Sequence, residues 1–196
     1  MTRPRSDGVA TYQVVLFVCV SVALAFAGDA LVGTLENASR GVDWTGLCEC
    51  FAGLLMLSVS VVATINGGRA GVWRFSASDV LFALAKGLTL VVLLAISRPE
   101  RSPANWSLVA ATYAVAVVLH LGHVRNVISD ATRHYRSHLR AAQRGAAVLA
   151  VIMAVCFTLS CITRPTMEVH LAPVTAAAIS LFALIAESKL SRASSI

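Results

Sequence analysis

The chain alternates long apolar stretches with short polar segments. A helix needs about 20 predominantly apolar residues to cross the hydrocarbon core of a bilayer. Six stretches approach that length: residues 12–33, 46–65, 78–96, 107–124, 146–161 and 171–186. The pattern predicts an all-α polytopic integral membrane protein, a bundle of about six transmembrane helices with short loops. This transmembrane domain would span residues 12–187, between polar tails at 1–11 and 188–196.

Glycine, proline and charged residues separate the apolar stretches. Asn66-Gly67-Gly68 follows the second stretch, a segment with Pro99 and Pro103 follows the third, and Arg164-Pro165 follows the fifth. Proline and glycine disfavour helix interiors, and charged loops belong in water. We therefore expect a helix to end at each of these three joints.

The aromatic residues Tyr12, Trp44, Trp73 and Trp106 all fall at the edges of predicted helices. Tryptophan and tyrosine are enriched at membrane surfaces, where one side of the ring is apolar and the other meets water. The sequence therefore predicts that these four rings mark the two membrane surfaces.

The basic residues are unevenly divided between the two ends of the predicted helices. With a cytoplasmic N-terminus, eleven of the sixteen lysines and arginines fall on the cytoplasmic side and four on the other. The sixteenth, Lys86, lies inside the third stretch. Because cytoplasmic loops carry the excess of lysine and arginine, we expect both termini in the cytoplasm.

The first stretch allows two alternatives. Two arginines, an apolar run and the small residues around Ala25-Phe26-Ala27 resemble a cleavable signal peptide covering residues 1–27. The apolar run continues to Gly33, however, which favours a retained first span.

Composition agrees with a membrane protein and excludes some function classes. The chain is 57% hydrophobic and 13% charged, whereas soluble domains average about 45–50% apolar and about 25% charged residues. The net charge of +6 comes from loops between apolar stretches, so we expect no nucleic-acid binding. No phosphate-binding loop, hydrolase elbow or zinc-protease motif is present, so no cofactor is predicted and an enzyme is disfavoured.

Lys86 is the most informative residue, because it lies about eight residues into the third stretch, near the bilayer centre. A cation at that depth costs about 2.5–3.5 kcal/mol on insertion scales. Asp79 lies seven residues earlier, on the same helical face and roughly 10 Å along the axis. Lys86 either faces a polar cavity, where it would bind an anion or couple to protons, or extends to the cytoplasmic interface near Asp79.

Asp29 and Glu49 lie near the non-cytoplasmic ends of the first two stretches. Antiparallel neighbours would bring the two carboxylates to a similar depth. They either form a mouth that attracts cations or mark the helix ends at the interface. Together with Lys86 and Asp79, they are the candidate residues of a substrate or ion pathway.

A basic segment covers residues 128–144, with apolar residues at helical steps of three and four. Its arginines Arg133, Arg136 and Arg140 would attract anionic lipid headgroups if the segment lay in the membrane surface. The alternative is a cytoplasmic extension of the fourth or fifth span.

Two histidine pairs, His120 with His123 and His134 with His138, have the spacing of residues on one helix face. Such pairs are compatible with metal binding. Arginines surround the second pair and would repel a cation, and no other stretch holds a central histidine. We therefore predict no metal site and no haem.

Small residues provide candidate faces for close helix packing, which is how helices associate in lipid. The candidate faces are Ala23/Ala27, Ala83/Gly87 and Ala146/Ala150/Ala154. They favour a packed bundle, and also a homo-oligomer or a complex with another membrane protein.

Two function classes remain after these observations. The first is a small transporter or channel subunit for an ion or small solute, which depends on the charged residues within or near the spans. The second is a non-catalytic membrane scaffold, assembly factor or envelope component, which depends on the scarcity of polar residues within most spans.

Overall fold

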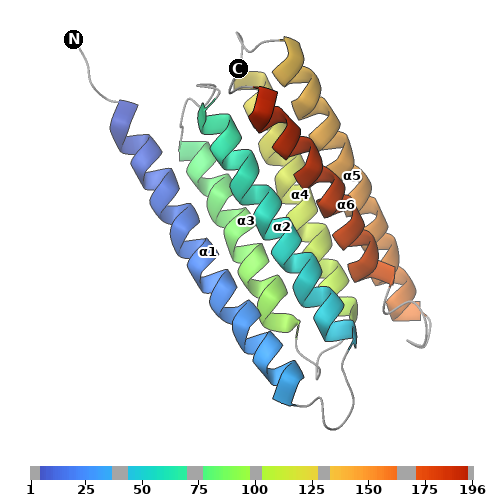
Figure 1. Cartoon of the computed structure of the whole chain (residues 1–196). Coiled ribbons are helices and arrows are strands. Elements are labelled where there is room, and N and C mark those ends of the chain that lie inside the picture. Colours follow the sequence, from blue (N-terminus) through green and yellow to red (C-terminus); the bar gives the residue numbers. More distant parts are fainter. Residues whose placement is uncertain are drawn as a thin grey trace.

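The computed structural model describes residues 5–36, 44–69, 77–97, 103–127, 133–162 and 171–193. These residues form six helices: α1 (Arg5–Glu36), α2 (Trp44–Arg69), α3 (Ala77–Ile96), α4 (Pro103–Val127), α5 (Arg133–Ile162) and α6 (Leu171–Ala193). Figure 1 shows them side by side in one bundle. The predicted all-α fold is confirmed.

The helices pack mainly as four pairs: α1 with α3, α3 with α4, α4 with α5, and α2 with α6. α1 lies at one edge of the bundle and contacts α3 and α2. Successive helices alternate in direction, so α1 begins and α6 ends at the same end (Figure 1). We call this end, which holds Arg5 and Ala193, the termini end, and the opposite one the far end.

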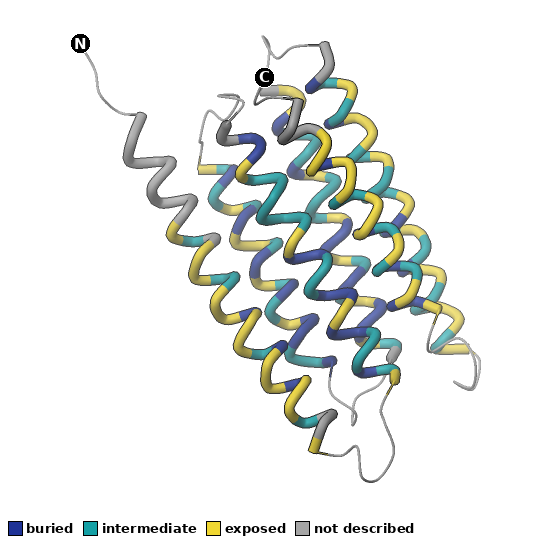
Figure 2. Tube along the Cα trace, viewed as in Figure 1, coloured by how far each residue is buried: buried dark blue, intermediate teal, exposed yellow. Residues whose placement is uncertain are grey.

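Five helices of the described chain have segments long and apolar enough to cross a membrane, at 19 to 28 residues each. Among the described side chains of α1, a shorter apolar segment runs over Phe17–Gly33, and α1 itself runs unbroken from Arg5 to Glu36. Figure 2 shows exposed positions along the outer sides of the helices. Large apolar side chains such as Phe17, Leu81 and Phe182 are among them. Because hydrocarbon solvates such side chains and water does not, the chain is a multi-pass integral membrane protein.

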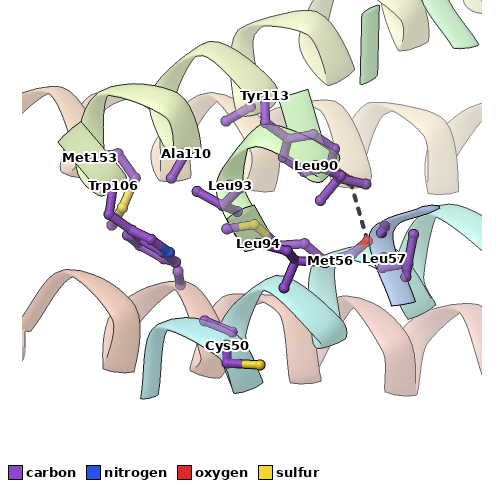
Figure 3. Close-up of a cluster of buried hydrophobic side chains, with 14 of the residues drawn as sticks. Cys50, Met56, Leu57, Leu90, Leu93, Leu94, Trp106, Ala110, Tyr113 and Met153 are labelled. Atoms are coloured by element: carbon purple, nitrogen blue, oxygen red, sulfur yellow. Dashed lines mark hydrogen bonds between the residues drawn. The ribbon is translucent and has the colours of Figure 1, made fainter. Parts of the chain in front are cut away.

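The core of the bundle includes Leu93, Leu94, Trp106 and Met153, which Figure 3 shows together. Trp106 is only 1% exposed, and its Nε1 donates a hydrogen bond to Ser97 Oγ at 3.2 Å. The prediction that Trp106 marks a membrane surface was therefore wrong. The Ser97 hydroxyl satisfies the indole N–H, which removes the usual cost of burying it.

Of the other three aromatic rings predicted at a membrane surface, the structure describes the side chain of Trp44. Trp44 opens α2 and is 67% exposed, as a ring at a membrane surface would be. The side chains of Tyr12 and Trp73 lie outside the described part of the chain.

One predicted helix end is displaced. α2 does not stop at Asn66-Gly67-Gly68 but continues to Arg69. Asn66 and Gly67 are buried there, so tertiary contacts of Asn66 override the weak helix preference of these residues. The next predicted helix end is confirmed, because α3 ends at Ile96. α4 begins at Pro103, before the predicted stretch 107–124, since proline is well tolerated in a first helical turn. Pro165 lies outside the described residues.

Close packing of small residues joins α1 to α3. Ala23, Ala27, Ala83 and Gly87 are all buried, and a Cβ added at Gly87 would lie 2.7 Å from Cys19 Cβ. Only glycine allows α1 and α3 to approach so closely at this point.

The third candidate face, Ala146/Ala150/Ala154, is less buried than the other two. Ala146 and Ala150 are half-buried and Ala154 is exposed. This stripe is therefore not a continuous buried face within the single chain.

The basic segment is the beginning of a longer helix. α5 starts at Arg133 and continues without interruption to Ile162, so residues 133–144 extend the fifth span, as one of the two alternatives required. Tyr135 and Leu139 on this extension are buried in the bundle. Residues 128–132 lie outside the described part of the chain.

Candidate functional site

A cavity of about 390 Å³ lies among α2, α3, α4, α5 and α6. Most of its lining is apolar, and α1 contributes no described residue to it. The residues with polar side chains that line it are Ser60, Thr64, Lys86, Tyr113, His120, Tyr135, His138, Ser180 and Glu187. Four of the cavity's helices thus supply an ionisable side chain to this space among the helices.

The first polar group around the cavity is the lysine cluster, formed by Lys86, His120, Asp79 and His123. Lys86 Nζ donates a hydrogen bond to His120 Nδ1 at 2.8 Å, because an ammonium group has donors only. With Nδ1 acting as acceptor, the neutral imidazole carries its proton on Nε2. That Nε2 lies 3.6 Å from Asp79 Oδ1.

The same carboxylate also faces the second histidine of the cluster. His123 Nε2 lies 3.7 Å from Asp79 Oδ1. The ring of Phe82 packs against both imidazoles, with centroid distances of 5.4 Å to His120 and 5.7 Å to His123. Phe82 therefore packs beside the two imidazoles that face Asp79.

Lys86 and Asp79 carry opposite charges on α3, and His120 of α4 lies between them. Lys86 and Asp79 are seven residues apart, which corresponds to roughly 10 Å along a helix axis. His120 of α4 lies between them, bonded to Lys86 and close to Asp79. The cluster therefore extends from the cavity to the first turn of α3, where a carboxylate is favoured by the helix dipole.

The second polar group is the glutamate cluster, formed by Glu187 of α6, His138 of α5 and Asn66 of α2. Glu187 Oε1 lies 2.8 Å from His138 Nε2, and Glu187 Oε2 accepts a hydrogen bond from Asn66 Nδ2 at 2.8 Å. Asn66 Nδ2 is also 2.9 Å from the Glu187 carbonyl oxygen. One carboxylate thus ties three helices together, with both of its oxygens engaged by the protein.

A pair of hydroxyls lies deeper along the cavity wall. Ser60 Oγ and Tyr113 Oη are 2.7 Å apart, and Tyr113 Oη is 3.3 Å from the Met56 carbonyl oxygen, a contact drawn in Figure 3. These groups satisfy one another, so this part of the wall offers a mostly apolar surface.

The predicted pathway residues fall into two separate sets. Lys86 lines the cavity and Asp79 lies next to its histidine partners, which is the geometry of the cavity alternative. Asp29 is exposed and Glu49 is 5% exposed, and both belong to the far end of α1 and α2. The structure therefore does not bring Asp29 and Glu49 to the cavity.

The three predicted lipid-binding arginines lie on the first turns of α5. Arg140 is exposed and Arg136 is half-buried, while the side chain of Arg133 lies outside the described residues. Arg136 and Arg140 do not line the cavity. Lipid binding by these arginines stays a prediction.

Sequence reasoning missed four residues of the site: Asn66, His120, His138 and Glu187. The histidines were considered only as pairs along one helix, whereas each meets a residue of another helix. Within the described part of the chain, no group of three or more histidine, cysteine, aspartate or glutamate side chains could hold a metal ion. The available signal was Glu187, an acidic residue at the end of an otherwise apolar stretch.

The chain was also compared with known proteins. No family model, curated protein or solved structure matches it.

Proposed function

We propose that this protein is a transporter of a small organic solute and that the cavity is its binding site. The observation that carries the proposal is the cavity itself, which gathers Lys86, His120, His138 and Glu187 inside the membrane-spanning bundle. Ionisable groups within a membrane are costly, and they commonly line substrate or proton pathways.

The size and lining of the cavity support a small organic solute. Binding sites for such ligands usually occupy about 300–1,000 Å³ and combine an apolar wall with a few polar groups. The volume of about 390 Å³ lies within that range. The polar groups are few and come from different helices, which suits recognition of one charged or polar end of a ligand.

The position of the cavity supports transport over simple storage. Asn66, His120, His138 and Glu187 lie in the halves of their helices nearer the termini end. Trp106 and Leu93 pack the core nearer the far end. A solute bound in the cavity would have this packed core between itself and the far end. The core would need to rearrange before the solute could cross the membrane, as alternating access requires.

Uptake into liposomes tests the proposal with two permanently charged probes, benzenesulfonate and phenyltrimethylammonium. They share an aromatic ring, differ in the sign of the charge and cross bare lipid slowly. We expect saturable, protein-dependent uptake of at least one probe. If neither probe enters vesicles containing folded protein, the transport proposal fails and the membrane-scaffold alternative gains.

A matched pair of glycine variants links uptake to the cavity. Gly145 lines the cavity, and a Cβ added there meets no atom within 4 Å, so Gly145→Leu would extend into the open space. Gly28 on α1 also has no atom within 4 Å of an added Cβ but does not line the cavity. We expect Gly145→Leu to abolish uptake and Gly28→Leu to preserve it. Equal uptake by the two variants would place the pathway elsewhere.

A further inference from the structure

We infer that the transported solute is an amphipathic organic anion, with a carboxylate- or sulfonate-like head and a short apolar body. The inference rests on the proposed function and specifies its substrate class. The structure assigns the head to the Lys86 ammonium and the body to the apolar walls from α2, α4, α5 and α6.

The charged groups around the cavity differ in how many of their hydrogen-bonding positions already have a partner in the protein. Both carboxylate oxygens of Glu187 already have partners, His138 on one and Asn66 on the other. A cationic solute would have to displace one of these partners to reach the carboxylate. The cost of leaving a buried hydrogen-bonding group unsatisfied then opposes its binding.

Lys86 presents the opposite case. Its ammonium has three N–H donors, and among the described residues the hydrogen bond of Nζ goes to His120 Nδ1. The remaining donors are available to the oxygens of an anionic head in the cavity that Lys86 lines. An anion there would gain a charge-assisted hydrogen bond, the stronger class of such bonds in a low-dielectric site.

His120 positions the Lys86 ammonium for binding an anion. Its Nδ1 accepts one N–H of Lys86, and its Nε2 is directed toward Asp79 at 3.6 Å. The Asp79 carboxylate therefore offsets part of the positive charge of Lys86 without occupying the cavity-facing donors. The hydrogen bond to the imidazole restricts the position of the ammonium, which lowers the ordering cost of binding.

The rest of the wall determines the body of the solute. Val59, Val117, Leu121, Leu149, Ile179 and Phe182 are among the apolar lining residues. The hydroxyls of Ser60 and Tyr113 bond to each other, so they do not call for a polar ligand. A sugar or polyol would lose water at many hydroxyls without replacement partners, whereas a ring or short alkyl chain would lose little.

An anionic head could reach Lys86 from a dissolved solute or from a lipid headgroup. The two sources are separated by measuring benzenesulfonate uptake in phosphatidylcholine vesicles and in vesicles mixed with phosphatidylglycerol. A dissolved substrate predicts equal saturable uptake in both, after correction for the surface potential. Lower saturable uptake in the vesicles with phosphatidylglycerol, after the same correction, would assign the site to lipid and overturn the inference.

Charge selectivity of the unmodified protein is the primary test, because it does not depend on any variant folding. We expect benzenesulfonate uptake to exceed phenyltrimethylammonium uptake by about tenfold or more, since hydrogen bonds to charged groups contribute about 1.5–3 kcal/mol. Preferential uptake of the cation would overturn the anion inference while leaving the transport proposal in place. Failure of both probes would overturn the transport proposal itself.

Variants then assign the selectivity to one residue. Lys86→Gln should lower benzenesulfonate uptake about tenfold or more, for the same energetic reason, and Lys86→Arg should retain part of it. Lys189→Gln is the matched control, because Lys189 is exposed on α6 and does not line the cavity. If Lys86→Gln and Lys189→Gln transport the anion equally well, Lys86 is not its binding residue and the inference fails.

Discussion

The contact between His138 and Glu187 should be a measurable stabilising interaction between α5 and α6. Glu187 Oε1 and His138 Nε2 are 2.8 Å apart, and the two side chains are 9% and 16% exposed. His138→Ala would leave a largely buried carboxylate with the Asn66 amide as a remaining partner. Removing one partner of a buried polar group typically costs about 1–3 kcal/mol.

A double-mutant cycle isolates the pairwise interaction from the other effects of each substitution. Interhelical hydrogen bonds in membrane proteins average about 0.6 kcal/mol and reach about 1.7 kcal/mol. A bond to an ionised carboxylate is about twice as strong as a neutral one. For His138→Ala and Glu187→Ala we therefore expect a coupling free energy of about 1–1.5 kcal/mol.

The assay is reversible unfolding in mixed detergent–SDS micelles, followed by circular dichroism for the parent, both single variants and the double variant. The control cycle uses Arg125 and Gln143, another pair between adjacent helices, whose hydrogen bond is 3.2 Å long and exposed. Exposed polar pairs contribute little, so its coupling should stay below about 0.5 kcal/mol. Equal coupling in the two cycles would refute the reasoning that burial makes the His138–Glu187 contact strong.

Two further predictions concern packing and topology. Gly87→Ala should lower the free energy of unfolding by about 1–3 kcal/mol, because the added Cβ meets Cys19 and forces α1 away from α3. Gly28→Ala, where an added Cβ meets open space, should be nearly neutral in the same assay. Equal losses of stability in the two variants would contradict the close approach of α1 and α3. Reporter domains fused to the two ends of the chain should both be cytoplasmic, because the arginine excess lies at that end of the helices; a reporter on each side of the membrane would contradict the six-span count.

Much of the architecture could be predicted from local sequence. Backbone groups in hydrocarbon must bond within their own segment, so an apolar stretch of spanning length is driven to form a helix whatever its neighbours are. The six apolar stretches therefore anticipated α1 to α6, although α4 begins at Pro103, before the predicted stretch 107–124. The depth of Lys86 in the third stretch was also readable, because position within a span needs no tertiary information.

The partners of these residues depended on the tertiary structure. His120 is 34 residues from Lys86, Glu187 is 49 from His138, and Asn66 is 121 from Glu187. Small residues indicated which faces of α1 and α3 pack closely, but the order of the helices in the bundle, which decides the partners of each polar residue, leaves no local signal. Tertiary partners also explain why α2 continues past Asn66 and why Trp106 is buried in the core. The polar group of each side chain bonds to a residue of another segment, which local preference does not encode.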